Sequence, residues 1–307
     1  MKRTLWLLWV PLAFPQEGPE RRLVARRDPG TITVERGDRI VLAYRYGDAP
    51  FKPYLRTLTT PGGFQILRDS PADHVHHRGV MFAVEVNRTD FWAEGARSGK
   101  QVHAGLDIDG GGVSAGFPRL RLSQKLEWAP PGEGRAVLQE ERSVETYEGA
   151  ALGATLVTWR SRLRAGKDLE KAVLTGSHYQ GLGIRFVASM DGSERFLHAA
   201  GEPGPVVRGT ERVTPSAWTA YTASAEGRPV TVALFDHPAN LRHPAGMFTM
   251  FKPFSYLSAT PNVWKNPYEL RAGEVLDLRY GVACWDGEPD RNRVEELYGR
   301  WKDLAGP

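Results

Sequence analysis

The amino-acid sequence predicts an all-β protein, a large antiparallel β-sandwich with a short α-helix at its C-terminal end. Short apolar segments recur through the 307 residues, and glycine, proline and aspartate separate them without intervening helical patterns. Hydrophobic residues make up 41% of the chain and aromatic residues 10%, which is enough to form a substantial core. A single convincing helical pattern lies near the C terminus.

The predicted strands follow one another along the chain. Residues 31–34 lead through a turn at 35–38 into residues 40–46, which indicates a β-hairpin. Residues 80–86 form a mostly apolar run that predicts a buried strand. Later strands are predicted at residues 120–126, 136–144, 154–163, 169–175, 230–235 and 276–284. Residues 110–112, all glycine, lack the lysine and hydroxyl residue of a phosphate-binding loop, so we interpret them as a turn.

The C-terminal segment has the periodicity of an α-helix. Apolar side chains recur there at helical spacing, namely Val294, Leu297, Tyr298, Trp301 and Leu304. Asp290 can cap the start of this helix, and Gly306 follows its end. We expect the helix to pack on the outside of the sandwich.

The first 22 residues predict an export signal. Lys2 and Arg3 provide a positive start, and residues 4–14 are dominated by Leu, Trp and Val over about the length of a signal-peptide core. This run is too short for a confident bilayer span. We therefore expect a periplasmic or extracellular protein in which residues 23–307 form a single β-sandwich domain.

Charge and cysteine content limit the possible functions. The 40 Lys and Arg residues are spread among 36 Asp and Glu residues, and no nucleic-acid-binding motif is present. Beyond the amino terminus no apolar stretch reaches the roughly 18 residues of a helical span, so we predict neither nucleic-acid binding nor a membrane span after export. Cys284 is the only cysteine, so any metal would need His and carboxylate ligands. Its predicted strand suggests a buried structural thiol.

The most concentrated group of titratable side chains lies in the segment Asp73-His74-Val75-His76-His77-Arg78-Gly79. It places three of the eight histidines within four positions, beside an acid and a guanidinium. Histidine titrates near neutral pH and is also a common metal ligand. In an extended chain, the rings of His74 and His76 would point to one face and that of His77 to the other.

Two further clusters carry polar and aromatic residues. Residues 177–186 combine His178 and Arg185 with an aromatic residue and glycines that permit close backbone approach. Residues 235–244 contain two His-Pro pairs after a predicted strand, so their side chains belong to a loop. Downstream, Lys252, Asn262 and neighbouring aromatic residues suit a sugar, which presents apolar ring faces and hydroxyl edges.

These segments carry a family resemblance. Residues 53–58, 73–79, 86–92, 178–186 and 236–244 resemble a bacterial family labelled "methane oxygenase PmoA", over about residues 40–286. The methane monooxygenase subunit of that name is built of transmembrane helices, and this chain lacks such stretches, so copper-dependent methane oxidation is not carried over. Residues 267–284 are similar to the segment that leads into a late strand of galactose-mutarotase-like supersandwich proteins. This fold occurs in carbohydrate epimerases, lyases and hydrolase accessory domains.

The first functional hypothesis is a carbohydrate-active enzyme that uses acid–base chemistry, such as an epimerase, lyase or hydrolase. Within this hypothesis we expect the three clusters to converge on one pocket. The candidate catalytic residues are His76, His77, His178, Asp236, His237 and Glu85. The candidate substrate-binding residues are Arg78, Trp92, Arg185, His243, Lys252, Asn262, Trp264 and Tyr268. Among these, the arginines would hold hydroxyls or a uronate, and Trp92, Trp264 and Tyr268 would stack on a sugar face.

Two alternatives remain open at this point. In the first, His74, His76 and His237 hold a divalent metal ion that serves hydrolysis or oxygen chemistry. In the second, the protein binds carbohydrate without catalysis, and the histidines only form hydrogen bonds. We predict no obligatory cofactor and a sugar or sugar-derived small molecule as partner.

Overall fold

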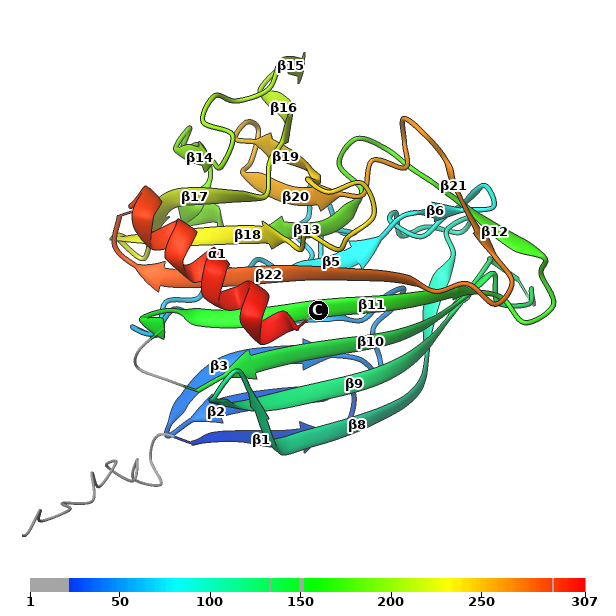
Figure 1. Cartoon of the computed structure of the whole chain (residues 1–307), viewed down its shortest axis with the longest axis horizontal. Helices are drawn as coiled ribbons and strands as arrows, with labels where there is room; N and C mark the ends of the chain where they lie inside the picture. Colours follow the sequence, from blue (N-terminus) through cyan, green and yellow to red (C-terminus); the bar gives the residue numbers. More distant parts are fainter. Residues whose placement is uncertain (1–21, 133, 149–151, 289, 307) are drawn as a thin grey trace, which may run out of the picture.

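The computed structural model describes residues 22–132, 134–148, 152–288 and 290–306. Residues 1–21 of the predicted export segment therefore lie outside the described residues. The described chain forms two large antiparallel sheets, a smaller third sheet and one α-helix (Figure 1). This arrangement confirms the predicted all-β sandwich with a C-terminal helix.

The first sheet has ten strands and supports the candidate site. Its order is β1 (Leu23–Asp28), β2 (Thr31–Arg36), β3 (Arg39–Arg45), β4 (Tyr54–Leu58), β5 (Val80–Ala83), β13 (Gly181–Arg185), β20 (Tyr256–Thr260), β19 (Gly246–Met250), β16 (Glu211–Pro215) and β15 (Val206–Arg208). Strands that are distant in sequence, such as β5, β13 and β20, are therefore direct neighbours.

The second sheet has eight strands and the third has four. The second sheet runs β14 (Phe196–His198), β17 (Trp218–Ala225), β18 (Arg228–Asp236), β22 (Leu276–Asp286), β11 (Thr155–Ala165), β10 (Leu138–Tyr147), β9 (Phe117–Ala129) and β8 (Lys100–Ser114). The third sheet runs β21 (Tyr268–Arg271), β12 (Lys171–Thr175), β6 (Glu85–Val86) and β7 (Thr89–Asp90). A short 3-10 helix, η3, spans Ala188–Met190.

Two of the local predictions were wrong. The apolar run 80–86 is not one strand, because β5 joins the first sheet whereas β6 pairs in the third sheet. The three glycines at 110–112 do not form a turn, because they lie within β8, where its pairing register with β9 shifts between Asp109 and Gly112.

The main core lies between the two large sheets. Alternate residues of each strand point into it, as expected for strands with one face on the core. The ring of Phe82 in β5 lies 6.0 Å from that of Trp128 in β9 and 6.4 Å from that of Tyr280 in β22. Cys284 is buried in the same core, as predicted.

The helix α1 (Arg291–Ala305) covers the outer face of the second sheet, across β22 and β11 (Figure 1). The side chain of Asp290 accepts a hydrogen bond from the backbone amide of Asn292 and caps the helix, and Gly306 follows its end. Trp301 packs 5.6 Å from the ring of Phe235. The helix therefore protects a second apolar cluster on a sheet that already has one face in the main core.

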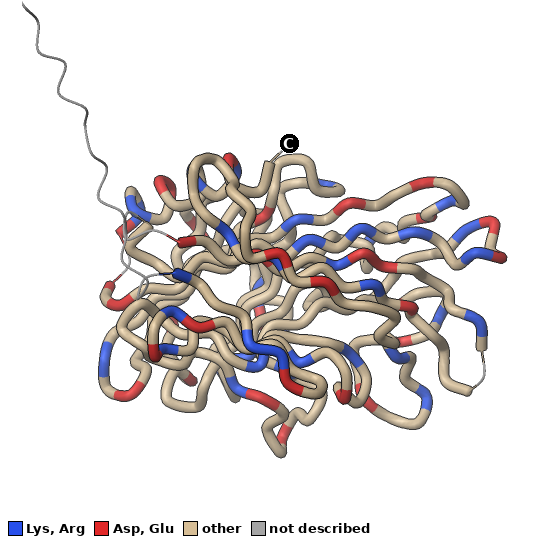
Figure 2. The backbone as a smooth tube through the Cα atoms, turned by 90° about the horizontal axis from the view of Figure 1, so that it is seen from below, with Lys and Arg blue, Asp and Glu red and all other residues tan. Residues whose placement is uncertain are grey.

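Charged residues are intermixed over the molecule. Figure 2 shows basic and acidic positions alternating along the outer strands and loops, in line with the net charge of +4. Among the described residues, none of the helices combines the length and apolar character needed to cross a bilayer.

Candidate functional site

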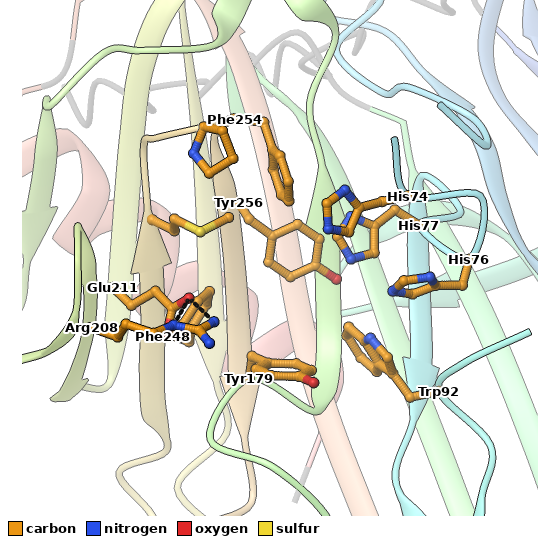
Figure 3. A pocket seen from close by; sticks show the side chains of 12 residues that line it. His74, His76, His77, Trp92, Tyr179, Arg208, Glu211, Phe248, Phe254 and Tyr256 are labelled. Atoms are coloured by element: carbon orange, nitrogen blue, oxygen red, sulfur yellow. Dashed lines mark hydrogen bonds and ion pairs between the residues drawn. The ribbon is translucent and has the colours of Figure 1, made fainter. Parts of the chain in front are cut away.

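The candidate site is a cavity of about 390 Å³ on the face of the first sheet that points away from the second sheet (Figure 3). It is lined by His74, His76, His77, Trp92, Tyr179, Arg208, Glu211, Phe248, Met250, Pro253, Phe254 and Tyr256. Leu182 pairs with Phe82 and points into the core, so the next residue, Gly183, faces the cavity side. A Cβ atom at Gly183 would lie 1.9 Å from the hydroxyl oxygen of Tyr256, so glycine leaves room for that phenol on the cavity floor.

The histidine loop, residues 73–79, curls so that all three imidazoles face this cavity. The backbone amide of His74 donates to the carbonyl of Pro71, and the amide of His77 donates to the carbonyl of His74. The ring centroids lie 4.5 Å apart for His76 and His77 and 4.9 Å apart for His74 and His77. The chain is therefore not extended here, and His77 does not point to the face opposite His74 and His76, because two successive turns bring its ring beside theirs.

A buried ion cluster holds the histidine loop from beneath. The guanidinium of Arg78 donates to the carboxylate of Glu94, with a shortest distance of 2.6 Å, and also approaches Asp69 at 3.5 Å. Lys52, whose side chain is fully buried, donates to the same Glu94 carboxylate at 2.9 Å. Arg78 does not line the cavity. It is placed to position the loop, in contrast to the predicted contact with substrate.

Gly79 ends the loop in a conformation that favours glycine. Its φ is +45°, and an added Cβ would lie 2.0 Å from the carbonyl oxygen of Leu55. We expect Gly79→Ala to lower the free energy of unfolding by at least about 2 kcal/mol, because strained backbone and steric overlap add. Gly63→Ala is the matched control, since Gly63 also has a positive φ but nothing within 4 Å of an added Cβ. Urea denaturation would measure both variants, and equal losses of unfolding free energy in Gly79→Ala and Gly63→Ala would contradict this account.

Burial keeps two of the imidazoles neutral. His77 is 6% exposed, and burial, together with the neighbouring His76 and His74, lowers its pKa to about 2. Burial also lowers the pKa of His76, with a smaller contribution from the positive charge of Lys52. Both rings are therefore unprotonated at neutral pH.

This burial predicts a pH-dependent stability. The unfolded chain binds a proton at His77 below about pH 6.5, whereas the folded chain does not until about pH 2. The free energy of unfolding should therefore fall as the pH is lowered through this window, by up to about 1.4 kcal/mol per pH unit from this residue. The free energy of unfolding would be measured by denaturant titration at several pH values between 7 and 4. Its dependence on pH should be weaker in His77→Asn than in the wild type. Identical slopes would show that His77 is not buried in its neutral form.

Glu211 and Arg208 form the wall opposite the histidines (Figure 3). Arg208 donates to Oε1 of Glu211 at 2.6 Å, and Nε2 of His178 lies 3.0 Å from Oε2. Burial alone would raise the pKa of Glu211, but the hydrogen bonds from Arg208 and His178 outweigh it and lower the pKa. Glu211 is thus an ionised carboxylate, and His178 contacts it from behind the cavity wall.

Aromatic rings form much of the remaining surface. Trp92 and Tyr179 lie side by side with centroids 5.7 Å apart, and the ring of Tyr256 is 4.8 Å from that of His77. The indole Nε1 of Trp92, the hydroxyl of Tyr256 and Nδ1 of His77 are buried without a hydrogen-bond partner among the described residues. Buried polar atoms are usually paired, so this concentration of unpaired atoms beside one cavity marks it as a binding region.

The third predicted cluster does not converge on the cavity. Asp236 is buried at the end of β18, where it accepts hydrogen bonds from Asn240, from Nδ1 of His243 and from a backbone amide. The ring of His237 lies 5.7 Å from that of Trp301 in α1. The expectation of a shared pocket was wrong for these residues, because β18 belongs to the second sheet and their polar atoms are used within their own loop.

The alternative metal set is not assembled. His74 and His76 line the cavity on the first sheet, whereas His237 lies beside α1 on the second. Throughout the described ranges, no group of three His, Cys, Asp or Glu side chains is arranged to hold a metal ion.

The other predicted residues lie around the cavity or away from it. Glu85 and Tyr268 belong to the third sheet, and Lys252 is exposed beside the cavity residue Pro253. Trp264 lies 5.9 Å from the ring of His178, and the backbone amide of Asn262 binds the hydroxyl of Thr260. None of these five predicted residues is part of the cavity lining.

Arg185 also lies outside the lining. Its guanidinium is 3.7 Å from the ring centroid of Phe254, which does line the cavity, and 3.6 Å from the carboxylate of Asp73. Its side chain is 1% exposed. Arg185 therefore connects the histidine loop to the cavity wall.

Sequence reasoning missed Glu211, Arg208, Tyr256 and Phe248 as site residues. Tyr179 and Phe254 stood within the clusters it considered, but were not chosen. Strand β16, which carries Glu211, has no run of titratable residues that would single it out.

A larger hollow of about 940 Å³ lies beside the β2–β3 turn, but no histidine lines it.

Comparison with known proteins places the chain in a family. Residues 31–299 match the Family of unknown function (DUF6807). The chain belongs to this family. The match covers both large sheets except β1, and most of α1, so the cavity lies within the family's shared region. No curated protein matches the sequence.

Several solved glycoside hydrolases are similar in structure at low identity. The galactosidase domain of an α-galactosidase-sucrose kinase, AgaSK, aligns with 92% of this chain and 43% of its own, at 10% identity and a TM-score of 0.48. A GH36 α-galactosidase, AgaA, from Geobacillus stearothermophilus in complex with stachyose aligns with 91% of this chain and 42% of its own, at 13% identity and a TM-score of 0.48. The same enzyme in complex with raffinose gives a TM-score of 0.44 at 13% identity, over 90% and 42% of the two chains. This chain spans about two fifths of the length of these proteins.

Proposed function

We propose that this protein is a carbohydrate-active enzyme that binds one small sugar or sugar derivative in the cavity and transfers a proton on it. The observation that carries the proposal is the arrangement of His76 and His77 opposite the Glu211 carboxylate in one aromatic-lined cavity. Titratable groups that face one pocket are what general acid–base catalysis requires.

The surface of the cavity suits a sugar. Trp92 and Tyr179 present apolar ring faces, and Glu211 can accept hydrogen bonds from hydroxyl groups. A volume of about 390 Å³ lies in the lower part of the range of roughly 300–1,000 Å³ that is typical of small-molecule sites. These features favour a single sugar unit or a short derivative.

The protonation states favour proton abstraction over glycoside hydrolysis. Hydrolysis needs a carboxylic acid whose raised pKa keeps it protonated. Glu211 instead has a lowered pKa, and His76 is neutral because burial lowers its pKa. In the proposed reaction, neutral His76 accepts a proton from the sugar and the resulting imidazolium returns it to another atom of the same molecule. An epimerase or a lyase fits these roles better than a hydrolase.

The proposal can be tested by proton NMR in D₂O. A panel of aldoses, ketoses, oxidised sugars and uronates would be incubated with the protein and followed for anomer interconversion, carbon-bound deuterium incorporation or an elimination product. We expect at least one sugar to show one of these changes. Release of a new reducing end from an oligosaccharide, without exchange, would indicate a hydrolase. Binding without any reaction would favour the non-catalytic alternative.

We also propose that the protein acts outside the cytoplasm. Residues 1–22 have the charge and length pattern of an export signal. Fusion of these residues to a reporter that is active only after export should give activity, whereas a fusion that starts at residue 23 should not. Equal reporter activity in both fusions would contradict export.

A further inference from the structure

We propose that the ligand of this cavity is a neutral sugar and that the cavity rejects uronates, an inference that rests on the proposed function. It follows from the pairing of the two charged side chains that line the cavity and from the position of three buried cations behind it. The sequence had suggested that Arg78 and Arg185 hold hydroxyls or a uronate, but Arg78 is bound to Glu94, and Arg185 is 1% exposed and lies 3.6 Å from the carboxylate of Asp73.

The cavity wall contains one cation and one carboxylate, and they neutralise each other. Arg208 and Glu211 are the Arg, Lys, Asp or Glu residues of the lining, and their side chains meet at 2.6 Å. Arg208 is largely exposed whereas Glu211 is 9% exposed, so the carboxylate is the less solvated of the two charges. A carboxylate on a ligand would therefore meet a partly buried negative charge.

Three buried cations near the cavity face carboxylates of the protein. Arg78 and Lys52 share the carboxylate of Glu94 beneath the histidine loop. Arg185 lies between Asp73 and Asp191, at 3.6 Å and 3.8 Å, and its side chain is only 1% exposed, although its Nε and Nη1 have no hydrogen-bond partner among the described residues. None of these three cations lines the cavity.

The imidazoles do not supply a positive charge with which a ligand carboxylate could pair. His77 is buried and His76 is half-buried, and this burial lowers the pKa of both rings, so they are neutral at neutral pH. The remaining ring, that of His74, is paired with the carboxylate of Asp73 at 3.1 Å. Arg208 is the cation among the described lining residues, and it is already paired with Glu211. An anionic ligand would therefore lose its hydration without gaining an unpaired positive charge from the lining, whereas hydroxyl groups can form hydrogen bonds with Glu211 and the ring nitrogens.

The test compares sugars that differ only in a carboxylate. Dissociation constants would be measured by calorimetry for glucose against glucuronate, galactose against galacturonate and mannose against mannuronate. In the pair that matches the cavity, we expect the neutral sugar to bind at least about tenfold more tightly, since placing like charges together is strongly unfavourable. Tighter binding of the uronate would overturn this inference, and turnover of that uronate would leave the proposed function intact.

Two variants test the electrostatic basis. Glu211→Gln removes the negative charge and releases Arg208, so the preference for the neutral sugar should shrink by about tenfold or reverse. Glu145→Gln is the matched control, because Glu145 is also a buried carboxylate paired with an arginine, Arg121, but lies on the second sheet. An equal preference in Glu211→Gln and Glu145→Gln would overturn the inference. Absence of binding by every sugar of the panel would overturn both the inference and the proposed function.

Discussion

Replacement of His76 by alanine is expected to lower kcat/KM for the sugar substrate by about 10²- to 10⁴-fold, the usual contribution of a general acid–base group. The dissociation constant of the substrate should change much less, because Trp92, Tyr179 and Glu211 still line the cavity. Steady-state kinetics and calorimetry on the same preparations would separate the two effects. Activity in the wild type should also decline as the pH falls through the lowered pKa of His76, because protonation removes the base.

His103→Ala is the matched control for this variant. His103 is a half-buried histidine whose Nδ1 lies 3.0 Å from the side-chain amide of Gln124, and it does not line the cavity. His103→Ala should keep kcat/KM within about twofold of the wild-type value, since substitutions near the surface and away from the site have small effects. Full activity of His76→Ala would rule out His76 as the proton-transferring group and would favour a binding protein.

Replacement of Arg142 by alanine is expected to lower the free energy of unfolding by about 3–5 kcal/mol. The side chains of Arg142 and Glu140 are both fully buried, and their shortest contact is 2.7 Å. Arg142 also donates to the carbonyl of Pro53 and to the side chain of Gln101, and so connects β10 to two other segments. Its loss would leave the Glu140 carboxylate buried without a counter-charge. Guanidinium chloride denaturation would measure the change.

Arg162→Ala provides the comparison for this second variant. Arg162 pairs with Glu141 at 2.9 Å, but both side chains are more than one third exposed. Exposed ion pairs contribute about 0–1 kcal/mol, so this variant should lose far less stability than Arg142→Ala. Similar losses in the two variants would show that burial does not govern the strength of these pairs.

The sequence predicted the local features that depend on neighbouring residues. The apolar spacing from Val294 to Leu304, with Asp290 before it and Gly306 after it, defined α1. Most predicted strands were confirmed because their apolar runs match the strands of the two large sheets, as at β11 and β22. The sequence also located the histidine loop as the densest group of titratable side chains, and this loop does line the cavity.

The opposite wall of the cavity could not be predicted in the same way. Glu211 lies across the cavity from the histidine loop. This position depends on the order of the first sheet, in which β13, β20 and β19 lie between β5 and β16. This order depends on pairing between strands that are distant in sequence, and no local pattern encodes it. The separation of Asp236 from the cavity has the same origin, since β18 joins the second sheet.

The sequence by itself determined part of the strands, the capped helix and the concentration of imidazoles at residues 74–77, because side-chain periodicity and turn residues act over short distances along the chain. Only the tertiary structure decided which charges meet. The Lys52–Glu94–Arg78 cluster holds the histidine loop in its curled form, and the first sheet brings Glu211 opposite the imidazoles. Burial then keeps His76 and His77 neutral, whereas hydrogen bonds keep Glu211 ionised. Both effects depend on packing between segments that are distant in the sequence.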